Sequence, residues 1–256
     1  MKKLDIGASI RLKYEDPAEV SAYTALAEEG LAKFEAALVR QSFAPGQRVL
    51  DVGCGGGREA VPMACFGFRV TGMDFILAMV QAARTYAVSK GQEIAFLVGD
   101  LTRLPFREAT FDGVTMLGQV IAHIPGRDSR VDALRSAWKA LRPGGMLAMT
   151  THNRDCHWKF RLYFAWANRI RRLARQLGYD GGLGDNDRWT VRISRARSRP
   201  KVFFHMYDRD EAIADLHAAG FEVLDARARA EYETDRDDPA LRARDYLLVF
   251  IARRPH

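Results

Sequence analysis

Closely spaced glycines follow a short apolar run near residue 50, and this pattern can serve ligand binding. Residues 49–52 (Val-Leu-Asp-Val) are followed by Gly53, Gly55 and Gly57. A strand that ends in glycines and turns into a helix lets a ligand approach the backbone closely. Alone, the pattern predicts either a nucleotide site or a tight strand-to-helix turn.

Two carboxylates follow later apolar runs. Asp74 comes 21 positions after Gly53, where an acidic residue can accept hydrogen bonds from ribose hydroxyls. Asp100 follows the next apolar run. Ligands of open α/β sheets bind at the carboxyl edge of the strands, so we expect both side chains at that edge beside the glycines.

The surrounding chain alternates between apolar runs and stretches with helical spacing. This alternation predicts βαβ units and a largely parallel sheet with helices on both faces. We expect strands at 48–53, 69–73, 94–98, 113–117, 146–151, 221–226 and 246–252, and helices at 58–66, 76–89, 129–141 and 209–219. Residues 143–145 (Pro-Gly-Gly) predict a turn, and 15–39 predict one long helix within an N-terminal helical cap, 1–44.

A dinucleotide fingerprint is the main rival for the glycine loop. It requires Gly-x-Gly-x-x-Gly, whereas the glycines here recur at every second residue and Arg58 stands where the last glycine would be. This difference disfavours NAD.

The run 49–151 resembles class I methyltransferases, especially the ubiquinone/menaquinone-methyltransferase-like group. The matching pieces are VLDVGCGGG, VTGMD, VGDLTRLPFREATFDGV and ALRPGG, in that order. The resemblance implies a Rossmann-like, mostly parallel seven-stranded sheet and the cofactor S-adenosyl-L-methionine. It implies that the glycines pack under the methionine, that Asp74 binds the ribose, and that Asp100 contacts the adenine. The cofactor-binding set that it implies is Asp51, Gly53, Cys54, Gly55, Gly57, Asp74, Phe75, Asp100, Leu101, Leu117 and Gly118.

Histidines near the ends of later strands are candidates for chemistry. Methyl transfer from a sulfonium is an in-line displacement, so the protein mainly supplies alignment and, for some acceptors, a base. His123 is the candidate base; the alternative is that it fixes its own loop. His152, at the end of the fifth strand, faces the acceptor or caps a loop. His205 and Tyr207 are expected to line the acceptor pocket.

Metal binding is not expected. Acidic, thiol and imidazole side chains gather at 152–157, but the chain has no second cluster at ligand spacing. The three cysteines have no paired spacing, and no apolar stretch reaches ~18 residues. We therefore expect a cytoplasmic protein without a transmembrane segment or secretory signal.

The positive charge is concentrated in one segment. The chain has a net charge of +7, whereas 153–200 alone holds twelve basic and four acidic residues, a net of +8. Such asymmetry indicates an anionic partner or surface. We interpret 153–200 as a basic insertion that forms a lid over the acceptor, with Arg192 and Arg195 contacting the acceptor.

The first part of this insertion has an amphipathic pattern. Within 157–177, Leu162, Trp166 and Ile170 recur at helical spacing, with arginines on the opposite face. A basic amphipathic helix can lie on an anionic membrane surface. The alternative is a lid helix that packs its apolar face on the domain and leaves its basic face in solvent.

Three functions fit these observations. The first is methylation, at O or N, of a small-molecule or lipid-like acceptor. The basic insertion leaves open that this acceptor is anionic. The second is a tRNA methyltransferase, because arginine-rich segments suit phosphate backbones. A short similarity at 203–207 (Phe-Phe-His-Met-Tyr) to tRNA wobble-uridine carboxymethyl methyltransferases also favours it. The third is a non-catalytic S-adenosylmethionine-binding module.

Overall fold

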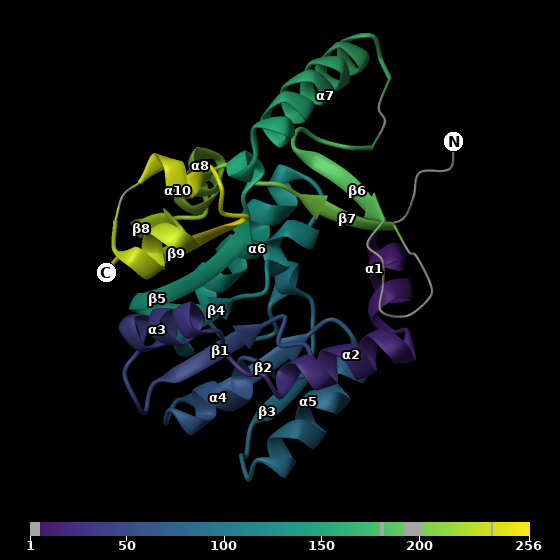
Figure 1. The fold of residues 1–256 in the computed structure, drawn as a ribbon. Helices are drawn as coiled ribbons and strands as arrows, with labels where there is room; N and C mark the ends of the chain where they lie inside the picture. The colour runs from purple at the N-terminus through teal and green to yellow at the C-terminus, as the bar shows by residue number, and fades with distance from the viewer. Residues whose placement is uncertain (1–5, 180–181, 192–200, 237) are drawn as a thin grey trace.

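A seven-stranded sheet forms the centre of the protein. The computed structural model describes residues 6–179, 182–191, 201–236 and 238–256 (Figure 1). The sheet order is β3-β2-β1-β4-β5-β9-β8. The strands are β1 Arg48–Val52, β2 Arg69–Asp74, β3 Ala95–Val98, β4 Phe111–Met116, β5 Leu141–His152, β8 Glu222–Ala228 and β9 Leu247–Arg253. Neighbouring strands pair in parallel except that β9 is antiparallel to β5 and β8. The predicted mostly parallel sheet is confirmed.

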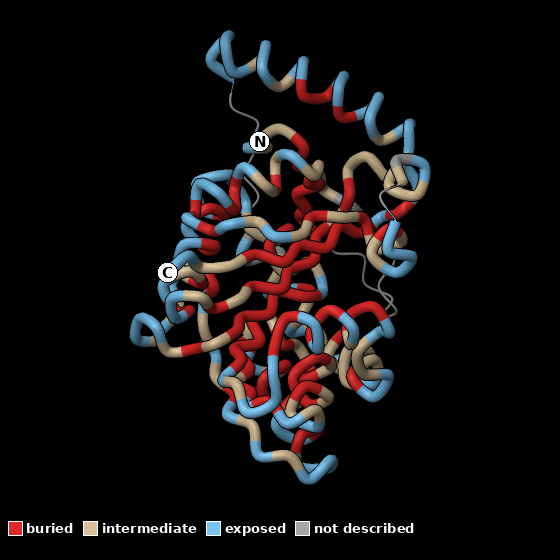
Figure 2. The backbone as a smooth tube through the Cα atoms, turned by 90° about the vertical axis from the view of Figure 1, so that its left-hand side faces the viewer, coloured by how far each residue is buried: buried red, intermediate tan, exposed pale blue. Residues whose placement is uncertain are grey.

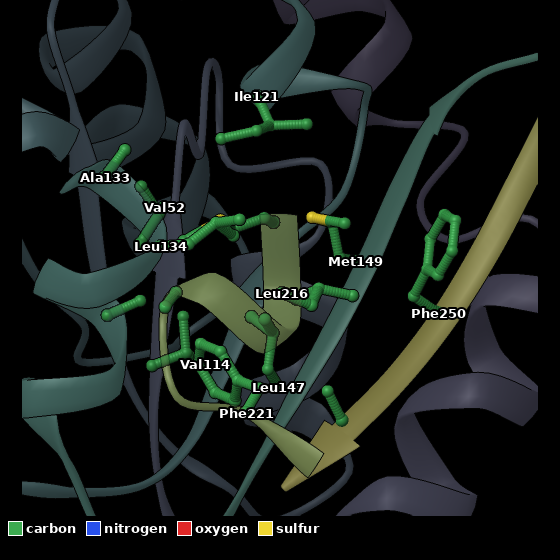
Figure 3. Packing of buried hydrophobic residues seen from close by; sticks show 14 of the residues in the cluster. Val52, Val114, Ile121, Ala133, Leu134, Leu147, Met149, Leu216, Phe221 and Phe250 are labelled. Carbon is green, nitrogen blue, oxygen red and sulfur yellow. The ribbon is translucent and has the colours of Figure 1, made fainter. Parts of the chain in front are cut away.

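Helices cover both faces of this sheet. On one face, α6 (Arg127–Ala140) and α8 (Arg209–Ala218) pack their apolar residues against β4 and β5, as with Leu134 and Leu216 near Val114 and Leu147 (Figure 3). On the other face, a second core joins α3 (Lys33–Ser42), α4 (Ala60–Cys65) and α5 (Leu77–Ser89). Burial on both faces explains why β1 is an apolar run without polar alternation.

The N-terminal segment forms three helices, so the prediction of one helix over 15–39 is wrong. They are α1 (Ile6–Tyr14), α2 (Pro17–Ala27) and α3. Pro17 begins α2 because its fixed φ suits a first helical position, and the Asp16 side chain accepts a hydrogen bond from the Ala18 N–H at 2.9 Å. Gly30, in the break between α2 and α3, has a φ of +68°, which a continuing helix does not permit.

Strand β5 begins at Leu141, five residues before the predicted start. The predicted turn at 143–145 lies inside this strand. Leu141 already pairs with Phe111, and the register then shifts before Gly113 pairs with Met146. The extra residues are therefore accommodated as an irregularity of the strand instead of a separate turn.

The basic insertion leaves the sheet at the end of β5. It contains η3 (Arg154–Cys156), α7 (Trp158–Gln176) and β6 (Asp187–Val191). Strand β6 forms an antiparallel hairpin with β7 (Lys201–His205), which directly follows the insertion. The predicted helix over 157–177 is present as α7, which projects from the body of the protein (Figures 1 and 2). Short helices α9 (Arg229–Thr234) and α10 (Pro239–Arg242), which the sequence pattern did not predict, precede β9.

Candidate active site

A cavity of about 770 Å³ lies at the carboxyl edge of the parallel strands. The loop after β1 and the ends of β2, β3 and β4 form one part of its wall. Residues of α1, α2, α3 and η2 (Val120–His123) also line it, together with Phe204 of β7. This is the edge where open α/β sheets bind ligands. The structure therefore brings the glycines and carboxylates that the sequence singled out into one concave site.

The glycine loop approaches the second strand closely. The Gly53 N–H donates to the Met73 carbonyl at 2.7 Å. Gly53 has a φ of +74°, and a Cβ at this position would lie 2.4 Å from Cγ2 of Val120. Only glycine satisfies both conditions, so this residue sets the path of the loop beneath the cavity.

Asp74 ties this loop to the next helix. Its two carboxylate oxygens accept hydrogen bonds from the Gly55 and Ile76 N–H groups, each at 2.9 Å. Burial raises the pKa of Asp74, although the backbone donors counteract this effect. Asp74 also lines the cavity, and a carboxylate oxygen has lone pairs for further donors. The arrangement can therefore hold a ribose hydroxyl beside the glycine loop.

Most residues of the predicted cofactor set line the cavity. They are Gly53, Cys54, Gly55, Asp74, Phe75, Asp100, Leu101, Leu117 and Gly118.

Asp51 and Gly57 do not line the cavity. Asp51 is buried below the glycine loop, where its Oδ1 accepts a hydrogen bond from the Thr115 hydroxyl at 2.8 Å. Burial raises the pKa of Asp51 to about 7. Gly57 packs against Ala83 of α5, because the chain has already left the cavity and turned toward α4.

An ion-pair cluster that the sequence reasoning missed also lines the cavity. Arg58 donates to both carboxylate oxygens of Glu35, at 2.6 and 2.9 Å, and to Glu59. Burial raises the pKa of Glu59 to about 8, while the nearby guanidinium of Arg58 counteracts it. The pair Arg58-Glu59 directly follows the glycines, but Glu35 belongs to α3, and no local spacing connects it with them.

His123 and Tyr14 meet at the other part of the cavity wall. His123 Nδ1 lies 3.2 Å from the Phe203 carbonyl oxygen, and its Nε2 lies 3.4 Å from the Tyr14 hydroxyl. A carbonyl only accepts hydrogen bonds, so in this geometry Nδ1 carries the proton and Nε2 of the neutral ring is an acceptor. Tyr14, from α1, was not among the predicted residues. Its partner lies 109 positions away in the sequence.

The predicted acceptor residues separate into two groups. His152 lines the cavity, with its ring against Phe204 at a centroid distance of 5.1 Å. His205 lies away from the cavity, because successive side chains of a strand point to opposite faces and Phe204 is the one that lines it. Tyr207 is also buried outside it, and its hydroxyl donates to Asp215 at 3.2 Å.

His205 instead belongs to a buried polar cluster that fastens the hairpin. Its Nδ1 lies 2.8 Å from Asp187 and its Nε2 lies 2.9 Å from Glu211 of α8. Burial opposes the charged ring, but the hydrogen bonds to these two carboxylates raise the pKa of His205. The predicted Arg192 and Arg195 lie outside the residues that the structure describes.

Helix α7, the first part of the predicted lid 153–200, lies away from the cavity. None of its residues, all of which the structure describes, lines the cavity. It buries Phe164, Ala167 and Asn168, whereas Leu162 and Trp166 are exposed. The face expected to pack on the domain therefore points to solvent.

Comparison with known proteins supports the cofactor half of this site. Residues 49–145 match a family model described as a methyltransferase domain. The ubiquinone biosynthesis O-methyltransferase of Caulobacter sp. (strain K31) is 35% identical over 129 residues, which are 50% of this chain and 49% of that protein. The chain thus spans about half the length of the curated relatives it matches.

Solved structures resemble the whole architecture. A SAM-dependent methyltransferase from Methanosarcina mazei has a TM-score of 0.65 at 20% identity, covering 88% of this chain and 99% of that one. The 1,6-didemethyltoxoflavin-N1-methyltransferase of Burkholderia thailandensis, with S-adenosylhomocysteine bound, has a TM-score of 0.62 at 20% identity. The structural match covers 100% of this chain and 92% of the Burkholderia protein. Together, these matches show a methyltransferase domain match at residues 49–145, within a chain whose fold resembles that of the solved methyltransferases.

Proposed function

We propose that the protein transfers the methyl group of S-adenosylmethionine to a hydroxyl or amine of a small-molecule acceptor bound in the cavity. The observation that carries the proposal is the composition of this one cavity. It joins the glycine loop and Asp74, which suit the cofactor, with His123, Tyr14 and His152, which suit an acceptor.

The cofactor would occupy the part of the cavity formed by the glycine loop. Asp74 would accept hydrogen bonds from the ribose hydroxyls, and Asp100 would contact the adenine, as the family resemblance implies. The methionine part carries both a carboxylate and an ammonium group, so it needs charges of both signs. Arg58 and Glu35, which form an ion pair at the cavity wall, supply them.

His123 would act as the base. In the reaction the bond between sulfur and the methyl carbon breaks while a bond from the acceptor oxygen or nitrogen to that carbon forms. The acceptor proton then passes to His123 Nε2, because the hydrogen bond to the Phe203 carbonyl leaves this nitrogen unprotonated. Tyr14, whose hydroxyl faces the same nitrogen, would position the ring. The alternative is that His123 only fixes the η2 loop.

The lining favours an acceptor that is aromatic or apolar with a single polar group. Tyr14, Tyr23, Phe204 and Tyr246 line the cavity, and Arg229 adds a positive charge. The curated relatives are named O-methyltransferases, which favours a hydroxyl. The Burkholderia neighbour, named for methylation at N1, has a small molecule bound, 1,6-didemethyltoxoflavin.

Radiolabelled cofactor tests this proposal. The purified protein is incubated with methyl-labelled S-adenosylmethionine and separate metabolite, lipid and tRNA fractions. Label in a metabolite or lipid fraction supports the proposal. Label only in tRNA would favour the nucleic-acid alternative. Cofactor binding without label in any fraction would indicate a non-catalytic module.

The role of His123 is tested on the labelled acceptor. If it is the base, His123→Ala should lower kcat by roughly 100-fold or more with near-normal cofactor affinity. His217→Ala, which changes an exposed histidine of α8, is the matched control. A His123→Ala variant with the parent kcat would leave alignment alone as the catalytic device.

A further inference from the structure

Helix α7 carries an apolar face that the fold leaves exposed. Seven large apolar or aromatic side chains on this face are between 45% and 67% exposed: Trp158, Leu162, Tyr163, Trp166, Ile170, Leu173 and Leu177. Their spacing of three, four or seven residues places them along one side of the helix. A contiguous apolar strip of this kind on a soluble surface marks a binding surface.

The opposite side of α7 is fastened to the protein by polar contacts. The Asn168 side chain donates to Asn186 Oδ1 at 2.9 Å and accepts from the Asn186 N–H at 3.0 Å. Arg171 donates to the Gly184 carbonyl at 3.1 Å. Phe164 is buried on the same side. The helix cannot turn its apolar face inward without breaking these contacts, so the fold holds that face outward.

The charge of the helix shows which occupant fits. Residues 158–176 contain six basic residues and no acidic one. Arg161, Arg169 and Arg172 follow the row of apolar residues along one edge, and all three are exposed. Two of the arginines are partly neutralised, because Arg172 and Arg175 pair with Asp185 at 2.6 and 2.7 Å. Arg161 and Arg169 lie beside the apolar face, whereas Arg171 lies on the opposite side of the helix.

We infer that α7 is an interfacial helix that docks the protein on an anionic lipid bilayer. Apolar side chains would enter the boundary of the acyl chains while the arginines contact lipid phosphates. The two tryptophans, Trp158 and Trp166, suit the interface between water and hydrocarbon. In the part of the chain that the structure describes, no helix is long and apolar enough to cross a membrane. The helix therefore lies on the bilayer without spanning it.

A second copy of the chain fits this face less well. Two α7 helices facing each other would bring the arginines along the edge of the apolar face, Arg161 and Arg169 of each copy, into one interface. Like charges that meet in an interface repel, whereas an anionic bilayer supplies the opposite charge and an apolar interior at once.

Vesicle flotation tests the inference without any acceptor. The parent protein should float with vesicles of phosphatidylcholine mixed with phosphatidylglycerol and remain unbound with phosphatidylcholine alone. Arg161→Gln with Arg169→Gln should weaken binding roughly 30-fold, because each surface arginine contributes about a factor of five. Leu162→Gln with Trp166→Gln should abolish the flotation. Leu77→Gln with Val88→Gln, which changes exposed apolar residues of α5, is the matched control and should float like the parent.

The outcomes separate this inference from the proposed function. Since flotation does not require methyl transfer, an inactive protein that floats supports the inference alone. A parent that stays unbound on anionic vesicles overturns it. If that parent is also dimeric in light scattering, and Leu162→Gln with Trp166→Gln makes it monomeric, a second copy covers the face instead. Thermal unfolding of each variant shows that the fold is retained, since every altered side chain is exposed.

Discussion

Asp74 offers the most direct test of the cofactor site. Replacement by Ala removes a carboxylate that lines the cavity and that also accepts hydrogen bonds from the Gly55 and Ile76 N–H groups. We predict that Asp74→Ala weakens the binding of S-adenosylhomocysteine. The ribose hydroxyls lose a charged acceptor, and the glycine loop loses its tie to the start of α5.

The size of the effect follows from the hydrogen bonds involved. A hydrogen bond to a charged group contributes about 1.5–3 kcal/mol. One such bond to the ribose therefore corresponds to roughly a 10- to 150-fold increase in Kd. Loss of the two backbone bonds adds a cost in folding stability that is not specific to the ligand. The two contributions are separable because one changes Kd and the other changes the unfolding temperature.

Isothermal titration calorimetry with S-adenosylhomocysteine measures Kd without knowledge of the acceptor. Asp208→Ala is the matched control, because Asp208 accepts a hydrogen bond from the Glu211 N–H at the start of α8 and does not line the cavity. This control should lose stability and keep its Kd. If Asp74→Ala binds the ligand within twofold of the parent, the placement of the ribose is wrong. Tight binding of NAD by the parent, without binding of S-adenosylhomocysteine, would reject the cofactor site as a whole.

Two further changes test the loop and the buried cluster. Gly53→Ala should lower both the unfolding temperature and the cofactor affinity, because its Cβ would lie 2.4 Å from Val120. Gly46→Ala is the control, because Gly46 has a φ of +84° and an added Cβ there would have no atom within 4 Å. It therefore shares only the backbone strain. Equal losses of unfolding temperature and cofactor affinity in both variants would refute the steric argument. For His205→Gln, the stability difference from the parent should be largest below the unfolded pKa of about 6.5. It should narrow as pH rises through the raised pKa of folded His205. Chemical denaturation at a series of pH values through this interval measures the stability difference between His205→Gln and the parent. A difference that widens as pH rises would contradict a stabilising imidazolium.

The central sheet could be predicted because its signals are local. Each parallel strand is an apolar run of a few residues between helical stretches, and burial on both faces makes that run continuous. The part of the cavity lined by the glycine loop and Asp74 could be predicted for the same reason, since these residues stand at strand ends. The single N-terminal helix was predicted wrongly because the Ala-, Glu- and Leu-rich pattern continues across Pro17 and Gly30. At these two residues the backbone cannot continue as one helix.

The rest of the site depends on contacts between distant parts of the sequence. Tyr14 meets His123 across 109 positions, and Arg58 meets Glu35 across 23. Neither pair has a spacing that a local pattern can reveal. His205 shows a different limit. The segment 201–205 was not recognised as a strand, and without its alternation Phe204 and His205 could not be assigned to opposite faces.

Acceptor choice is therefore expected to reside in the parts of the chain outside the matched domain, 49–145. The family match ends at residue 145, yet several side chains that line the cavity lie outside it. Tyr14 and Tyr23 come from the N-terminal helices, Phe204 from the hairpin, and Arg229 from α9. The hairpin is in turn held by His205 and its buried carboxylate partners. His123 Nδ1 faces the carbonyl of Phe203 in the same hairpin. The geometry around His123 therefore depends on the inserted segment. A relative that shares the glycine loop but replaces these elements would keep the cofactor and change the acceptor.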